Sequence, residues 1–274
     1  MGKIFRLLQY ANMLSLDIVA GAVISSAFFA KLLAVSILPF GYITLGLTVW
    51  IIYTADHLLD VWKNPKPAST ERHRLHQQYF NVLGVILVLA LIIVGIEVNF
   101  IRQSVLIGGI QLSILVAIYF IAQKHLKFLK EIAAAILYTG GVLIAPFSLL
   151  DGGLSPGQLI IVVQFFLTAL ANLLMFSLFD LKNDFEDSHP SIAISWGEST
   201  TMILLTVVFL IHAGLSVMYF TVYPGSLSAG SVILGMNVVL ILMVLKRNYF
   251  TIDDRYRVIG DGVFLLPSIF ILFG

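Results

Sequence analysis

The chain has 274 residues, of which 59% are hydrophobic and 11% are charged, and its mean hydropathy is +0.99. Because soluble domains are about 25% charged, this composition excludes a soluble protein and indicates one transmembrane domain over residues 1–274. The formal net charge of +1 gives no basic excess that would favour binding to nucleic acid. The hydrophobic composition makes the lipid bilayer the expected partner. Cysteine is absent, which excludes disulfides and thiolate chemistry.

Nine apolar segments are long enough to cross a bilayer, which takes about 20 residues. They cover residues 11–31, 36–61, 78–98, 103–122, 130–150, 158–180, 200–222, 227–245 and 258–273. The first follows Lys3 and Arg6 as the core of a signal peptide would, but Asp17 interrupts it and it is long enough to span. We therefore expect a retained helix and an all-α integral membrane protein with nine transmembrane helices.

The basic residues lie almost entirely in alternate connections. Fourteen of the sixteen Lys and Arg residues fall on one side of the nine predicted helices, and only Lys31 and Arg102 fall on the other. By the positive-inside rule, the amino terminus is then cytoplasmic and the carboxyl terminus lies outside. This uneven distribution supports the count of nine helices. With one helix fewer, the basic residues after the missing helix would fall on the opposite side of the membrane.

An acidic cluster follows the segment 158–180. Asp180, Asp184 and Asp187 are spaced so that they share one face of a helix, where like charges repel unless a cation lies among them. A hard divalent ion such as Mg²⁺ is a natural occupant, since it binds one or two carboxylates together with substrate phosphates. The alternative is a solvated acidic loop between membrane helices.

A second pair, Asp56 and Asp60, ends the segment 36–61 with the same spacing. The predicted topology places both pairs at the cytoplasmic face of the membrane. Each pair could hold a metal ion, and two ions together could clamp a diphosphate.

These motifs resemble those of the UbiA superfamily of intramembrane prenyltransferases. The family carries Asp-x-x-x-Asp motifs on cytoplasmic loops after its second and sixth helices, matched here by Asp56/Asp60 and Asp180/Asp184. Ile52 stands where the family usually has Asn. Tyr119 and the basic residues that follow it are similar to a further family feature near the diphosphate.

The resemblance implies nine helices around a central cavity that binds Mg²⁺ and an isoprenyl diphosphate, whose prenyl group is transferred to an acceptor, usually aromatic. It implies that Asp56, Asp60, Asp180 and Asp184 are catalytic metal ligands, with Asp187 as a further metal ligand. The candidate diphosphate contacts are Lys124, Lys127, Arg72, Arg74 and Lys182, although the positive-inside pattern alone would also explain these bases.

The candidate cavity residues are Tyr53, Tyr119, Tyr138, Asn172 and Asp17. Aromatic rings, including those of Trp50 and Phe176, could shield an allylic cation, or they could simply pack. Asp17 and Asp261 are intramembrane carboxylates that could bind the acceptor or remove a proton, or could reach the interface instead.

Three other functions remain open at this stage. A terpene cyclase of the same fold would let the cation attack the substrate's own double bond, and the missing Asn favours it mildly. A transporter would place its carboxylates along a path through the bilayer, whereas these are confined to one interface. A non-catalytic relative would keep the fold alone. A His-box iron enzyme is not expected, since His73 and His76 have no further clustered partners and His57 should face about 100° away from Asp56.

Overall fold

The computed structural model describes residues 3–63, 70–126, 129–187, 190–223 and 227–274, and over these ranges it contains helices and no strand. The long helices are α2 (Leu16–Leu32), α3 (Pro39–Lys63), α5 (Phe80–Glu97), α6 (Gln103–Leu126), α7 (Lys130–Ser148), α8 (Pro156–Phe179), α11 (Glu198–Val222) and α12 (Leu227–Leu245). The short ones are α1 (Lys3–Met13), α4 (Glu71–Gln78), η1 (Val98–Phe100), α9 (Leu181–Glu186), α10 (Ile192–Trp196), α13 (Arg247–Phe250), η3 (Ile252–Asp254), α14 (Arg255–Gly262), η4 (Val263–Leu265) and α15 (Ser268–Phe273).

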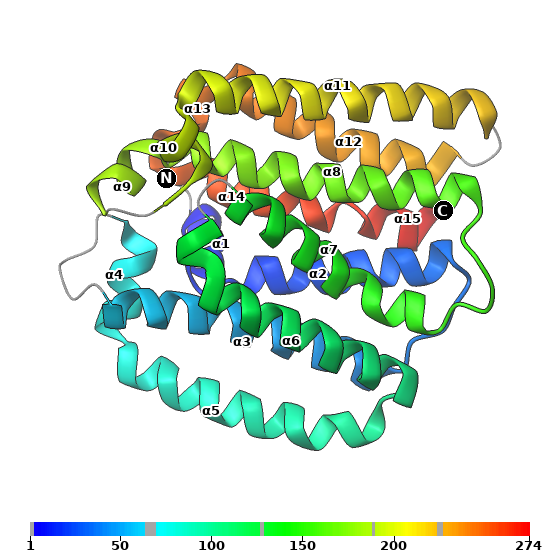
Figure 1. Cartoon of the computed structure of the whole chain (residues 1–274), viewed down its shortest axis with the longest axis horizontal. Helices are drawn as coiled ribbons and strands as arrows, with labels where there is room; N and C mark the ends of the chain where they lie inside the picture. Colours follow the sequence, from blue (N-terminus) through cyan, green and yellow to red (C-terminus); the bar gives the residue numbers. More distant parts are fainter. Residues whose placement is uncertain (1–2, 64–69, 127–128, 188–189, 224–226) are drawn as a thin grey trace.

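The long helices run side by side, and the short helices α4, α9 and α10 gather with α1 at one end of the bundle, opposite α15 (Figure 1). Every predicted segment overlaps a helix or, at the carboxyl end, a series of short helices. Seven elements in the described part of the chain are long and apolar enough to span a membrane, or up to eight if α1 and α2 form one bent span. The all-α membrane architecture is therefore confirmed, while the count of nine spans remains a prediction, because α12 contributes only a shorter apolar helix.

The chain bends sharply between α1 and α2. Ser15 adopts a left-handed conformation (φ 58°, ψ 21°), which a non-glycine residue rarely does, and α1 turns 79° away from α2. The predicted span 11–31 therefore begins at Leu16. The separate helix α1 is amphipathic, with Ile4 and Leu7 exposed next to Lys3 and Arg6, as in helices that lie along a membrane surface.

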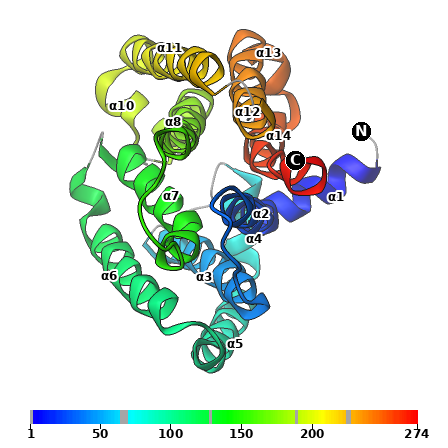
Figure 2. The ribbon, with the colours of Figure 1, turned by 90° about the vertical axis from the view of Figure 1, so that its right-hand side faces the viewer.

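Helix α8 is the centre of the packing. Ser155 and Gln158 form a capping box at its start, with Pro156 in its first turn, and residues such as Phe165 and Met175 are fully buried. It packs against α7, α11, α12 and α14, whereas α5 and α6 lie at the edge and expose most of their apolar side chains (Figure 2). Lipid is the solvent that such exposed apolar faces require.

A polar network joins α8 to α11 and α12. The Gln164 amide donates to Ser216 at 2.7 Å, and the Asn237 amide contacts Thr168 at 2.5 Å and His212 at 2.8 Å. All five side chains are buried. Such interhelical hydrogen bonds hold helices together where surrounding lipid gives no hydrophobic driving force.

Candidate active site

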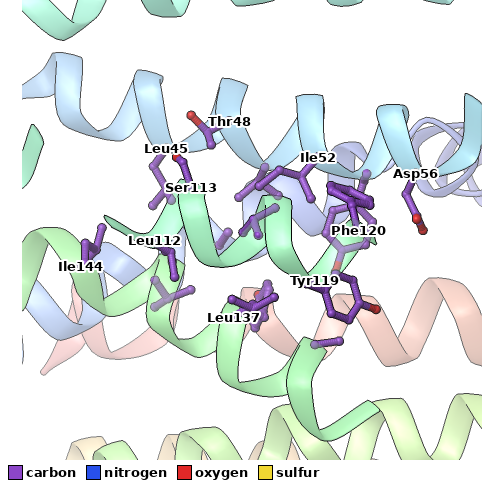
Figure 3. A pocket seen from close by; sticks show the side chains of 18 of the residues that line it. Leu45, Thr48, Ile52, Asp56, Leu112, Ser113, Tyr119, Phe120, Leu137 and Ile144 are labelled. Carbon is purple, nitrogen blue, oxygen red and sulfur yellow. The ribbon is translucent and has the colours of Figure 1, made fainter. Parts of the chain in front are cut away.

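A cavity of about 480 Å³ opens between α3, α6, α7 and α8. Asp56, Asp60, Asp180 and Asp184 all line it, so the structure brings the two acidic pairs to one site. The rest of its wall is mostly apolar. Figure 3 shows Asp56 at one end, with Ile52, Leu112 and Leu137 along the length of the cavity.

The first acidic pair lies on the last turns of α3. Asp56 receives a hydrogen bond from Gln123 on α6 and is attracted by Lys130, while Asp60 is a nearby like charge. Side chains from α6 and α7 thus partly offset the charge of this pair.

The second pair begins where α8 ends. Asp180 follows Phe179 as the C-cap of α8, and its Oδ1 accepts hydrogen bonds from Tyr256 and Arg257 of α14, each at 2.5 Å. Tyr256 is held in turn by stacking on Phe179, with ring centroids 4.9 Å apart. One acidic pair is therefore already partly neutralised by a protein cation.

A fifth carboxylate, Glu131, lines the same cavity. Its Oε1 accepts a hydrogen bond from the backbone N–H of Ile192 at 2.8 Å, and the next N–H, that of Ala193, donates to Ser177. Its Oε2 is buried and has no hydrogen-bond partner among the described residues. These bonds fix α10, which precedes α11, over the acidic end of the cavity.

A second buried polar cluster lies outside the cavity lining and ties α1 to α2, α4 and α14. The side-chain amide nitrogen of Asn12 donates to Asp17 at 2.6 Å and to Asp261 at 2.8 Å, and Arg72 donates to the side-chain Oδ1 of Asn12 at 2.6 Å. Arg72 also pairs with Asp261 at 3.7 Å. Burial lowers the pKa of the Arg72 guanidinium, but these carboxylates keep it charged.

The structure places the other predicted site residues as follows. Tyr53, Tyr119 and Tyr138 line the cavity, together with Phe176. Asn172 is buried near α14, and Asp17 and Arg72 belong to the Asn12 cluster, so these three are outside the lining.

The remaining predicted contacts lie elsewhere. Lys182 is exposed and pairs with Glu186, and Arg74 is exposed on α4. Asp187 follows α9 outside the cavity lining. Lys127 and the side chain of Lys124 lie outside the described part of the structure.

His57 is not as peripheral as helical spacing suggested. It lines the cavity wall, and its ring packs against those of His73 and His76, with centroids 5.4 Å and 4.7 Å away. Neither of its ring nitrogens has a hydrogen-bond partner in the described ranges. His73 and His76 belong to α4, so these ring contacts pack α4 against α3 beside the cavity.

Sequence reasoning missed Arg257, Tyr256 and Glu131. Arg257 was counted only as a topology signal, and nothing in the spacing of α14 links it to Asp180, which precedes it by 77 residues. Glu131 did carry a signal, because an acidic residue at the start of a membrane helix is a functional candidate by default.

The donor set fits a hard divalent cation. Five carboxylates line the cavity, and the described lining residues include only two Lys or Arg side chains, Lys130 and Arg257. Yet no group of three or more His, Asp or Glu side chains in the described ranges is close enough to hold a metal ion by itself. An ion here needs additional oxygen ligands, as Mg²⁺ does when it binds through substrate phosphates.

No known family profile and no curated protein sequence matches this chain. Solved structures do match it. A UbiA homologue from Aeropyrum pernix K1 in its apo form superposes with a TM-score of 0.68 at 13% identity, covering 93% of this chain and 97% of that one. A UbiA homologue from Archaeoglobus fulgidus bound to DMAPP and Mg²⁺ gives 0.63 at 10% identity, covering 97% and 99%.

A third structure, from a study of digeranylgeranylglyceryl phosphate synthase in membranes, gives a TM-score of 0.51 at 14% identity, covering 95% and 94% of the two chains. These likenesses extend over almost the whole chain. The protein is therefore an all-α membrane protein with the UbiA fold, as the acidic motifs led us to expect.

Proposed function

We propose that this protein is an intramembrane prenyltransferase of the UbiA type, which uses Mg²⁺ to bind an isoprenyl diphosphate and transfers its prenyl group to an aromatic acceptor. The observation that carries the proposal is the meeting of Asp56/Asp60 and Asp180/Asp184 at one end of a cavity with an apolar wall. A structure with the same fold was determined with DMAPP and Mg²⁺ bound.

The acidic end of the cavity would bind the diphosphate. Asp56, Asp60 and Asp184 would hold Mg²⁺, with Asp180 as a further ligand. Bound Mg²⁺ would neutralise the negative charge that accumulates on the departing pyrophosphate. Lys130 and Arg257 line the same end and can donate hydrogen bonds to phosphate oxygens.

The apolar length of the cavity would hold the prenyl chain and exclude water from the allylic cation. Tyr53, Tyr119 and Phe176 line the cavity near the acidic end, where their ring faces can stabilise a positive charge. Ile52 lies on this wall in place of the Asn that the family usually has, so no amide from this position orients the substrate.

The positive-inside pattern supports a cytoplasmic active site, with the amino terminus inside and the carboxyl terminus outside. The diphosphate group of a prenyl diphosphate is charged and stays in water. An acidic site at the cytoplasmic interface can therefore bind a donor that enters from the cytoplasm. The rival function, a terpene cyclase, differs in its product: it would release a cyclic hydrocarbon or alcohol without any added acceptor.

The test is Mg²⁺-dependent pyrophosphate release from geranyl, farnesyl and geranylgeranyl diphosphates by the purified chain. Asp56→Asn and Asp180→Asn should each reduce release by about 100-fold or more, since charge neutralisation by a metal supplies several kcal/mol. Asp151→Asn is the matched control, because Asp151 is exposed in the α7–α8 connection, away from the cavity lining.

The two variants should differ in stability. Asp180→Asn removes the charged partner of the partly buried Arg257 and should cost about 3 kcal/mol, whereas Asp56→Asn relieves a like-charge contact with Asp60. Unchanged pyrophosphate release in both variants would refute the assignment.

A further inference from the structure

Three helices line the cavity along one face each, over several turns. On α3 the lining residues recur every three or four positions from Gly41 to Asp56, as on α6 from Val105 to Tyr119 and on α7 from Glu131 to Ala145. This spacing is that of one helix face. The cavity therefore follows the helix axes instead of forming a rounded chamber at the acidic end.

The length of the cavity follows from helix geometry. At a rise of about 1.5 Å per residue, the axial distance from Gly41 to Asp56 is about 22 Å. The same rise gives about 21 Å from Val105 to Tyr119 and about 21 Å from Glu131 to Ala145. The three helices thus give nearly the same axial length for the cavity.

The end opposite the acidic residues is held by side-chain contacts. Phe40 and Phe100, next to the lining residues Gly41 and Ile101, stack with ring centroids 5.1 Å apart. Thr44 also donates a hydrogen bond to Glu97 at 3.0 Å. These contacts tie the first turns of α3 to the end of α5 and to η1, so they hold in place the elements that surround this end of the cavity.

An extended chain advances about 1.2 Å per bond, since the three bonds of one extended residue span about 3.6 Å. The four bonds that a prenyl unit adds to the chain therefore advance about 5 Å, and 21–22 Å corresponds to about four units. We propose that the length of the cavity selects a prenyl diphosphate of about four units, the geranylgeranyl class, over shorter ones. This proposal rests on the proposed function.

Gly109 offers a place to shorten the cavity. It lies on the cavity-lining face of α6, and a Cβ built on it meets no atom within 4 Å. It is about 15 Å along the helix axis from Tyr119 at the acidic end, the length of about three prenyl units. A leucine there would occupy the space of the fourth unit. Gly95 on α5 is a matched control, since its Cβ also meets nothing within 4 Å and it is outside the lining.

The experiment measures binding of unreactive thiolodiphosphate analogues with one to four prenyl units to the purified full chain in the presence of Mg²⁺. The wild type should bind the four-unit analogue at least tenfold more tightly than the two-unit analogue. Gly109→Leu should weaken binding of the four-unit analogue at least tenfold and that of the two-unit analogue less than twofold, and Gly95→Leu should change neither.

Equal affinity for all chain lengths, tightest binding of a shorter analogue, or the same effect of both Leu substitutions would overturn the chain-length selection. So would the absence of binding at every length. This binding assay requires no turnover, so a failure of the proposed enzyme activity would show separately, as absent pyrophosphate release from the natural diphosphates beside an intact order of affinities.

Discussion

The two carboxylate oxygens of Glu131 have different surroundings. One oxygen caps the start of α10 through Ile192, and the other is buried at the wall of the cavity. Glu131→Gln keeps a carbonyl oxygen for Ile192 and should change the free energy of unfolding by less than about 1 kcal/mol. Glu131→Leu leaves that N–H unpaired and should cost about 1–3 kcal/mol. Thermal unfolding in detergent compares the two, and equal losses would show that the hydrogen bond contributes nothing.

His76 predicts a pH dependence of stability. Its Nδ1 donates to the carbonyl of Arg72 at 2.9 Å, and burial lowers the pKa of its imidazole, whose neighbours include Arg72, His57 and His73. Because the folded pKa lies below the ordinary value of about 6.5, the unfolded chain gains the proton first, and stability falls as the pH drops below that value.

The melting temperature should therefore decrease between about pH 7.5 and about pH 5.5, a range that brackets the ordinary pKa of His. The decrease should be smaller in His76→Gln, which does not titrate in this range. An identical decrease in both proteins would assign the effect to other groups.

Of the site residues, those grouped by local helical spacing could be predicted from the sequence. Asp56 and Asp60, like Asp180 and Asp184, stand one helical turn apart, so their grouping could be recognised without coordinates. The pairing of Asp180 with Arg257 could not, because a contact between α8 and α14 is set by packing and leaves no periodic pattern. Asn172 shares the apolar environment of true lining residues, and only its rotation on α8 places it outside.

At the scale of single elements, the close approach of α14 to α8 positions the groups that bind Asp180. A Cβ at Gly260 would lie 2.6 Å from Phe176 Cε1 and 3.0 Å from Asn172 Oδ1. Gly260→Ala should therefore push α14 away, cost about 1–3 kcal/mol and lower pyrophosphate release, since α14 carries Tyr256 and Arg257.

Gly262 is the control on the same helix. A Cβ there meets nothing within 4 Å, so Gly262→Ala should be neutral or stabilising by about 0.4–1 kcal/mol. Unfolding temperatures and initial rates of both variants provide the measurement. Equal stability and equal rates of the two variants would mean that α8 and α14 can move apart without loss of stability or activity.

Helix positions were predictable because membrane-length apolar runs dominate this sequence. The division between α1 and α2 was not, since the apolar run passes through it. The left-handed turn at Ser15 follows Asn12, whose side chain bonds to Asp261 and Arg72. That bend is thus associated with partners distant in the sequence, beyond the reach of local hydrophobicity.

At the scale of the whole molecule, metal and diphosphate should bind together. Five carboxylates line one cavity but the described ones do not form a three-ligand site alone, so on the proposed function Mg²⁺ should need the oxygens of the diphosphate. Mg²⁺ with an unreactive prenyl thiolodiphosphate at about a hundredfold excess over Kd should stabilise the fold by about 2.7 kcal/mol.

Either component alone should stabilise much less. Thermal unfolding with each component, with both, and with both plus a chelator provides the measurement. Full stabilisation by Mg²⁺ alone would instead indicate a site built entirely from protein ligands.

The Asn12 cluster also bears on how the chain is made. Asn12 is synthesised well before its partner Asp261, which lies 249 residues later in the chain. Until α14 has been synthesised, Asn12 and Arg72 lack their common partner Asp261, and Asp180 lacks its cation Arg257. The acidic end of the cavity can be completed only after α14 has been synthesised, so a chain released before α14 should insert into the bilayer but, on the proposed function, stay inactive.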